Sequence, residues 1–398
     1  MKNDLIHWRR DFHQNPELGF KEVRTSKIIR KELMDMGIKE IRILAKTGIE
    51  ALIRGKREGS TIMLRADMDA LPIQDQKNKA YSSKVDNIAH LCGHDAHTAI
   101  LLGAARLLMD KPLEAGNVKL VFQPAEEGLA GAKSMIEEGV LKNPEVDAVA
   151  ALHVQPSLPT GYISVCPNDC TANSDRFDLV ITGNGGHAGH PHKSVDSITV
   201  ASQIISSLQQ IVSRQTDPLK PVVLTIGKIN GGFARNVIAP FVSIEGTVRT
   251  LSEEMRKVVP KKLEQIVKGH CESFGSSYQF TYIEGYPSVK TDSALIPLLM
   301  NSSSSILGEG KCKLEKPSMG GEDFAYYTEQ VPGIYFRLGT RSEEKGCIYP
   351  HHHPMFDIDE EALPIGAALM ADYALNFLKE NKGQEQGHIM GGKNEKIH

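Results

Sequence analysis

Residues 118–128 have the sequence VKLVFQPAEEG, in which an apolar run ends at a turn that carries two adjacent carboxylates, Glu126 and Glu127. The run at 118–122 is predicted to be a buried strand. In open α/β sheets, functional sites are built at the carboxyl ends of strands. Because adjacent side chains project in different directions, one carboxylate can bind a metal ion while the other acts as a general base. An isolated Glu-Glu pair is more often a solvated acidic loop, so this interpretation depends on the rest of the chain.

Amphipathic helices and apolar strands alternate on both sides of this segment. The alternation predicts an α/β domain with a largely parallel sheet flanked by helices. The pattern is interrupted after about residue 172 and resumes near the end of the chain. The elements of this domain are predicted at 21–36 (helix), 61–65 (strand), 99–109 (helix), 118–122 (strand), 146–153 (strand), 334–338 (strand) and 361–378 (helix).

The interruption has a pattern of its own, with the order β-α-β-β-α-β. This order is typical of a ferredoxin-like unit, in which two helices cover one face of a four-stranded sheet. We therefore predict an inserted α+β domain at 173–286 within a discontinuous domain formed by 1–172 and 287–380. Residues 381–398 lack apolar periodicity and are expected to be a disordered tail. The predicted elements of the insert are a strand at 177–182, a helix at 195–214 opened by Ser194, strands at 222–229 and 242–250, a helix at 253–274 and a strand at 277–282.

Composition excludes several classes of protein. The 398 residues are 40% hydrophobic and 24% charged, which is ordinary for a globular protein with a sizeable core. The net charge is −3 and the basic residues are dispersed, so nucleic acid is not an expected partner. Neither a signal peptide nor a run of about 18 apolar residues is found, so we expect a cytoplasmic protein without a membrane partner. Six cysteines are too few for a disulfide framework in a chain of this length.

Several side chains that are known as metal ligands occur at strand ends or in loops of the predicted α/β domain. Cys92 and His94 flank a glycine, and a turn at Gly93 would let both reach one metal centre. His153 ends an apolar run, and three consecutive histidines occupy 351–353. Each feature alone is more often a structural residue than a ligand. Their occurrence together in one predicted domain indicates a metal site.

Six motifs, in order and spacing, resemble metallopeptidase family M20. The likeness is to its amidohydrolase branch, which includes hippurate hydrolases, aminoacylases and auxin-conjugate hydrolases, and it extends from about residue 7 to residue 378. The motifs are RADMDALP at 65–72, CGHD at 92–95, EEG at 126–128, GGH at 185–187, GGEDF at 320–324 and HHP at 352–354.

This resemblance implies a site for two divalent ions and a general base. Glu126 would be that base and would return the proton to the departing amine as an acid. Asp67 and Asp69 would orient ligand imidazoles, although a structural role in the turn before Pro72 is an equal alternative. Mn, Zn, Co and Ni all suit such ligands, so the sequence does not identify the metal. The implied ligands are Cys92, which would bridge the ions, His94, Glu127, His153 and His352.

The resemblance also implies a dimerisation, or lid, role for the insert. His187 would reach the active site of the partner subunit, and Asn236 and Arg249 would bind the carboxylate of the substrate. A homodimer through the insert is therefore expected, and a tetramer stays open. The implied reaction is hydrolysis of the amide bond of a small N-acyl amino acid by a metal-activated water.

Three alternatives remain at this point. A dipeptidase or carboxypeptidase of the same family is disfavoured, because those branches carry His-x-Asp where this chain has Asp67-Met68-Asp69, and an Asp in place of Cys92. A catalytically silent protein that binds a small ligand is possible, since fold does not fix function. A thiol hydrolase using Cys92 would leave the other candidate ligands unexplained.

Overall fold

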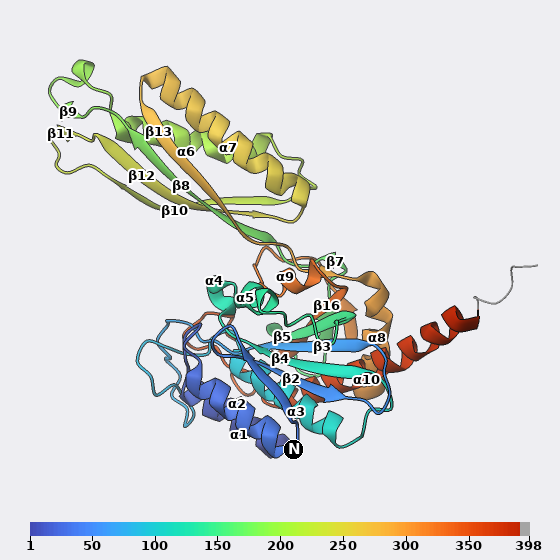
Figure 1. The fold of residues 1–398 in the computed structure, drawn as a ribbon. Coiled ribbons are helices and arrows are strands. Elements are labelled where there is room, and N and C mark those ends of the chain that lie inside the picture. The colour runs from blue at the N-terminus through green and yellow to red at the C-terminus, as the bar shows by residue number, and fades with distance from the viewer. Residues whose placement is uncertain (391–398) are drawn as a thin grey trace, which may run out of the picture. The chain divides into compact units, whose positions relative to one another are not determined.

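The computed structural model describes residues 1–390 and divides into two compact units (Figure 1). The first unit contains Met1–Asn168, Val289–Lys316 and the chain from Asp323 onward, and the second contains Asp169–Ser288 and Pro317–Glu322. The insert expected at 173–286 falls within the second unit. That unit also takes up the short segment at 317–322, which the pattern of strands and helices did not assign to it.

An eight-stranded mixed sheet forms the centre of the first unit, and its predicted largely parallel character is confirmed. The four strands at its middle are parallel to one another, whereas antiparallel pairs occur toward both edges. The central strands are almost wholly buried, which explains their continuous apolar sequences. In order across the sheet, the strands are β1 (Glu40–Leu44), β2 (Gly48–Arg54), β4 (Asn117–Gln123), β3 (Thr61–Asp67), β5 (Ala148–Pro159), β16 (Gly333–Arg341), β6 (Ile163–Val165) and β15 (Cys312–Leu314).

The helices of the first unit pack around a large hydrophobic core. The helix that begins at His94 is the most deeply buried of them, and the N-terminal and C-terminal helices pack against it. The helices are α1 (Lys2–Gln14), α2 (Val23–Asp35), α3 (His94–Met109), α4 (Glu126–Leu129), α5 (Gly131–Glu137), α8 (Ile296–Leu307), α9 (Ala325–Thr328) and α10 (Ala362–Met390), with a 3-10 turn at Ser293–Leu295.

The tail expected to be disordered at 381–398 begins inside α10. This helix continues to Met390, so residues 381–390 are helical, and 391–398 lie outside the described residues. Among the described residues, no helix combines the length and apolarity needed to span a membrane.

The second unit is built on a four-stranded antiparallel sheet in the order β10-β12-β8-β13. Two helices lie on one face of this sheet, and the arrangement is the ferredoxin-like one that the sequence predicts (Figure 1). Some boundaries were wrong. The strand predicted at 177–182 begins at Asn173, and the one predicted at 277–282 ends at Tyr286. The first helix begins at Ser197, and the side chain of Asp196 caps it by accepting from the amides of Ile198 and Thr199, so Ser194 is not the cap.

Several short strands complete the chain. The elements of the second unit are β8 (Asn173–Thr182), β9 (Gly186–His187), α6 (Ser197–Arg214), β10 (Val222–Gly231), β11 (Val237–Ile238), β12 (Phe241–Thr250), α7 (Glu253–Phe274) and β13 (Ser277–Tyr286), with a 3-10 turn at Pro191–Lys193. Where the chain passes between the units lie β7 (Asn168–Asp169) and β14 (Lys290–Thr291).

Candidate metal and catalytic centre

Three neighbouring parallel strands direct candidate residues to one edge of the first sheet. Asp67 ends β3, and the Glu126-Glu127 pair follows β4. Because parallel neighbours end at the same edge, these side chains are brought together. His153 was expected at the end of its strand, but β5 continues to Pro159 by pairing with β16, so His153 lies within the strand.

The turn before α3 depends on a glycine, as the sequence predicts. Gly93 has a left-handed backbone (φ 95°), and a Cβ there would lie 2.3 Å from Val154 Cγ2. This conformation places Cys92 and His94 on either side of the turn. The Sγ atom of Cys92 is 3.5 Å from Nε2 of His153, so a thiol and an imidazole from distant parts of the chain face each other.

His94 is oriented by an aspartate and leaves one ring nitrogen without a hydrogen bond. Its Nδ1 lies 2.9 Å from the Asp69 carbonyl oxygen and 3.1 Å from Asp69 Oδ1, which makes Nδ1 the donor. Its Nε2 is buried and makes no hydrogen bond. Burial opposes protonation, but the carboxylates of Asp67 and Asp69 raise the pKa of His94 well above its usual value. The same negative surroundings would favour a cation at Nε2.

Glu127 is held by the same aspartate. Its backbone amide donates to Asp69 Oδ2 over 3.0 Å, while its Oε1 is buried without a hydrogen bond and lies 3.3 Å from Nε2 of His352. The proximity of Cys92 and of the Glu127 carboxylate raises the pKa of His352 to about 10. Asp69 therefore contacts two candidate ligands at once, which supports the orienting role over a purely structural one.

The three consecutive histidines differ in their contacts. Nε2 of His351 donates to the Val154 carbonyl over 2.9 Å, and burial lowers the pKa of this side chain to about 3. His353 Nδ1 accepts from the Met355 amide. Only His352 faces the thiol and the carboxylate, on a left-handed backbone (φ 65°). The geometry thus agrees with the choice of His352 that the resemblance implied.

His97 is a residue to which the sequence assigned no role. Its Nδ1 bonds to Asp67, and its Nε2 accepts from the Val154 amide over 2.9 Å. Both ring nitrogens are therefore in use, so His97 anchors β5 beside the site rather than offering a ligand atom. Asp67 in turn bonds to Arg65 over 2.6 Å. The sequence feature that could have indicated a role for His97 is its position one helical turn after His94, which places both side chains on the same face of the helix.

The donor set fits divalent metal ions. Thiolate, imidazole and carboxylate together suit borderline ions such as Zn, Mn, Co and Ni. The two buried atoms without hydrogen bonds, His94 Nε2 and Glu127 Oε1, are the kind of atoms that a cation would satisfy. Within each of three overlapping groups, ligand atoms lie within 4.8 Å of one another: Cys92, His94 and His153; Cys92, Glu127 and His352; and His94, Glu126 and Glu127.

The three predicted substrate-binding residues belong to the second unit. His187 lies in β9, which pairs with β11, and the Ala188 amide donates to the Asn236 carbonyl, so His187 and Asn236 are neighbours at one two-stranded antiparallel pair. Arg249 lies on β12 and is half-buried, and burial lowers its pKa. Among the contacts of the described residues, its guanidinium has no ion pair or hydrogen bond. A Cβ on Gly321 would lie 2.8 Å from Arg249 Nη1, so the glycine leaves room for the guanidinium.

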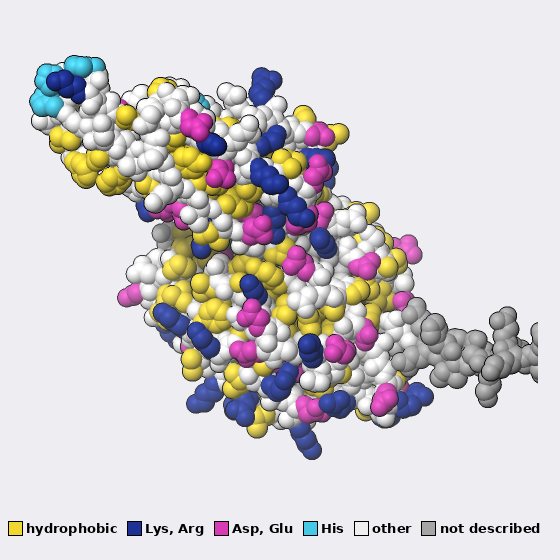
Figure 2. All heavy atoms as spheres, turned by 45° about the horizontal axis from the view of Figure 1, so that its top comes forward, with side chains coloured by type: hydrophobic (Ala, Val, Ile, Leu, Met, Phe, Trp, Pro, Cys, Tyr) yellow, Lys and Arg dark blue, Asp and Glu magenta, His cyan; other side chains and the backbone are white. Residues whose placement is uncertain are grey.

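Histidines gather at the end of the second unit that carries β9 and β11 (Figure 2). The rings of His187 and His190 are 5.4 Å apart, and those of His190 and His192 are 6.1 Å apart. The first of these three is the residue that the family motifs place at the active site of a partner subunit, and it is exposed. The sequence motif at 185–187 thus lies in an accessible, imidazole-rich loop.

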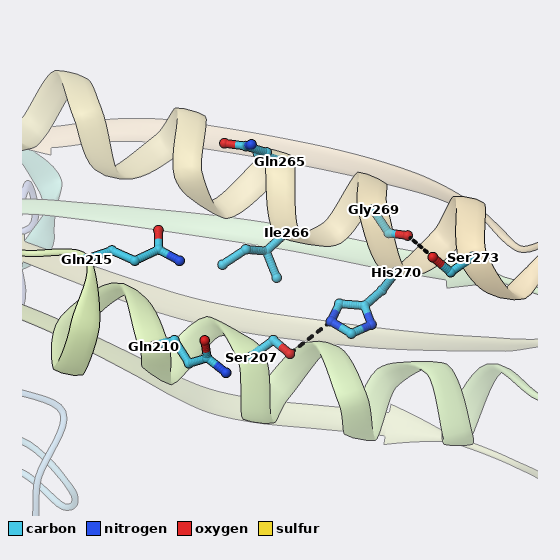
Figure 3. A pocket seen from close by; sticks show the side chains of 8 residues that line it. All are labelled: Ser207, Gln210, Gln215, Gln265, Ile266, Gly269, His270 and Ser273. Carbon is cyan, nitrogen blue, oxygen red and sulfur yellow. Dashed lines mark hydrogen bonds between the residues drawn. The ribbon is translucent and has the colours of Figure 1, made fainter.

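A separate groove of about 500 Å³ lies between α6 and α7 (Figure 3). Amides, hydroxyls and one imidazole line it, and His270 Nε2 is 2.8 Å from the Ser207 hydroxyl. None of the metal-ligating groups within residues 1–390 includes a residue of this groove. It therefore has no part in the centre described above.

Comparison with known proteins decides the family. Residues 63–376 match the model of peptidase family M20/M25/M40. The chain belongs to this family. An N-acetylcysteine deacetylase from Bacillus subtilis is 42% identical over 95% of this chain and 98% of its own length. The chain is thus an M20 hydrolase of the amidohydrolase branch, as its motifs indicate.

Two further similar proteins bear on its chemistry. Thermostable carboxypeptidase 2 of Saccharolobus solfataricus is 39% identical, covering 95% of this chain and 98% of the relative. The crystal structure of a dinuclear metal-binding M20 peptidase from Bacillus subtilis is 38% identical and superimposes with a TM-score of 0.83, covering 95% of this chain and 98% of that one. The candidate ligand groups of this M20 chain are consistent with that likeness.

Proposed function

We propose that this M20 hydrolase cleaves the amide bond of small N-acyl amino acids. The observation that carries the proposal is the convergence of thiol, imidazole and carboxylate groups around Cys92, with Glu126 beside them. The 42% identity to an N-acetylcysteine deacetylase supports a deacylation rather than another hydrolysis.

Two divalent ions would occupy the centre. Cys92 joins the group with His94 and His153 to the group with Glu127 and His352. The family motifs imply that it would bridge the ions, with His94, Glu127, His153 and His352 as the other ligands. Such ions, when bound, polarise the acyl carbonyl and lower the pKa of a water molecule. Mn, Zn, Co and Ni remain the candidates.

Glu126 would move the proton. It is largely buried, and its carboxylate lies close to the candidate ligands His94 and Glu127. We do not assign it as a metal ligand. We assign it the role of taking a proton from the attacking water and giving it to the amide nitrogen as the bond breaks. Without that return, the leaving group would be an amine anion.

The amino-acid half of the substrate would bind in the second unit. The guanidinium of Arg249 suits a carboxylate because its planar fork can donate two parallel hydrogen bonds. Asn236 would assist it, and His187 would act across the interface of a homodimer. Exposed Phe233 and Phe241, in contact in an edge arrangement, support an interface on this unit. A cytoplasmic location stays a prediction.

A carboxypeptidase activity is the second candidate, because a relative of that name is 39% identical. Both reactions hydrolyse an amide next to a carboxylate and use the same groups. They differ in the acyl side, which is a simple acid in one case and a peptide in the other. A catalytically silent binding protein is the third candidate. It would have the same metal-ligating residues but would not turn over a substrate.

The test is amine release from a matched panel of substrates. Chelated protein is assayed with N-acetyl, N-benzoyl and indoleacetyl amino acids and with dipeptides, before and after addition of Mn, Zn, Co or Ni. We expect metal-dependent release from N-acyl amino acids, and little from dipeptides. Preference for dipeptides would favour the peptidase, and no release with two ions bound would favour the binding protein. Arg249→Lys should raise KM far more than it lowers kcat, because a lysine keeps the charge but not the fork.

A further inference from the structure

Glu22 is a buried acid that the proposed chemistry does not use. It immediately precedes α2, without a capping hydrogen bond from its side chain, and is fully buried. Both carboxylate oxygens accept hydrogen bonds: Oε1 from the Ala125 amide over 2.9 Å, and Oε2 from the Thr47 hydroxyl over 2.6 Å. Burial raises the pKa of Glu22 to about 7. A buried acid costs free energy unless its contacts compensate, so its partners are informative.

The partner of Oε1 is the residue immediately before the proposed base. Ala125 has a left-handed backbone (φ 56°, ψ 44°), which residues other than glycine rarely adopt. It is fully buried, so without Glu22 its amide would have no hydrogen bond and no access to water. Because such a conformation persists only when its surroundings hold it, the Glu22 contact bears directly on the path of the chain into Glu126 and Glu127.

Two glycines, Gly19 and Gly48, pack closely against the same turn. A Cβ on Gly19 would lie 3.1 Å from both Cα and Cβ of Ala125, and a Cβ on Gly48 would lie 2.9 Å from Pro124 Cδ. Close packing therefore limits the turn from two sides, while the carboxylate supplies the hydrogen bond. Thr47 lies next to Gly48 between β1 and β2, so its hydroxyl links this packing to the carboxylate.

We propose that Glu22, oriented by Thr47, is a positioning residue that holds Ala125 in the left-handed conformation and thereby sets the directions of the Glu126 and Glu127 side chains. The inference rests on the proposed function. A general base must lie within hydrogen-bond reach of the proton it moves, and a displacement of about 1 Å lowers rates by about 100-fold.

Substitutions separate this role from a contribution to the core. Glu22→Leu removes both acceptors. Glu22→Gln keeps them in effect, because its carbonyl oxygen can accept from Ala125 while its amide donates to the hydroxyl of Thr47, which can also accept. Ile29→Ala is the matched control, since Ile29 is a fully buried residue of the same helix that does not contact the turn through a hydrogen bond.

The first measurement is hydrogen–deuterium exchange of the segment 124–131 in chelated, folded protein. We expect exchange at least about 10-fold faster in Glu22→Leu than in wild type, and unchanged exchange in Glu22→Gln and Ile29→Ala. Wild-type exchange in Glu22→Leu would overturn the proposal. This readout does not depend on turnover, so it holds even if the proposed reaction is wrong.

The second measurement is kcat of the metal-loaded proteins on an N-acyl amino acid, with Glu126→Gln in parallel. We expect kcat lowered about 10–100-fold in Glu22→Leu with little change in KM, and within about threefold of wild type in Glu22→Gln and Ile29→Ala. If Glu22→Leu does not fold, Thr47→Val supplies the test, with a smaller loss of kcat in the same direction. Loss in Glu22→Gln equal to that in Glu22→Leu, or wild-type kcat in Glu22→Leu or Thr47→Val, would overturn positioning. Full activity of Glu126→Gln would instead overturn the proposed function.

Discussion

The charge of Glu22 should make the stability of the chelated protein depend on pH, and Glu22→Gln should remove that dependence. Burial raises the pKa of this carboxyl from 4.5 to about 7. Between these two values the folded state holds a proton that the unfolded chain has released. Folding stability contributed by this group is therefore complete below pH 4.5 and falls as the pH rises through 7.

The size of the effect follows from the same values. One pKa unit corresponds to about 1.4 kcal/mol, so the rise to about 7 corresponds to about 3 kcal/mol of stability lost between pH 4.5 and pH 8. Gln is neutral throughout and keeps the hydrogen bonds to Ala125 and Thr47. The variant should therefore gain about 3 kcal/mol relative to wild type over this range, whatever its stability at pH 4.5.

The assay is urea denaturation of chelated wild type and Glu22→Gln from pH 5 to pH 9. Trp8 is the only tryptophan and is buried in α1, so its fluorescence reports unfolding of the first unit alone. We expect the midpoint of the variant to rise relative to wild type from pH 5 to pH 8 and the separation to become constant above pH 8. A difference between the two urea midpoints that is the same at every pH would refute the reasoning.

Three further substitutions have expected outcomes. Asp69→Asn should weaken metal binding about 10–100-fold in competition with a chromogenic chelator, because the orienting carboxylate is lost; unchanged affinity would contradict this. Arg9→Met should lower the free energy of unfolding by about 3–5 kcal/mol, measured by circular dichroism, because three carboxylates lose their buried cation. Gly131→Ala should lower Tm, since its Cβ would lie 1.7 Å from the Pro124 carbonyl oxygen, whereas Gly269→Ala, with open space, should not.

Much of the fold was predictable because the periodicity of apolar residues is strong. The strand before Glu126 and the helix after Gly93 have the predicted character, and the insert has the predicted order of elements. Boundaries were less predictable. β5 continues past His153 because its pairing with β16 extends, and a single sequence gives no information on the length of a partner strand.

The candidate ligands were predictable from motifs, but the contacts that hold them were not. The left-handed Ala125 has no local signature, because alanine is common in ordinary helices. Glu22 is about a hundred residues away from it, and nothing in the local pattern connects the two. His97 is three residues after His94, yet its partners are Asp67 and an amide of β5. Only the fold therefore distinguishes this anchoring histidine from the candidate ligand His94.

The division of labour between two adjacent carboxylates is the central claim, and metal content measured together with turnover tests it most directly. Glu126→Gln and Glu127→Gln are chelated and reloaded, ions per chain are counted by plasma mass spectrometry, and hydrolysis of an N-acyl amino acid is followed. We predict that Glu126→Gln keeps two ions but loses turnover, by about 100-fold or more, whereas Glu127→Gln binds at least one ion more weakly. Turnover preserved in Glu126→Gln, or two ions bound by Glu127→Gln with wild-type affinity, would contradict the account.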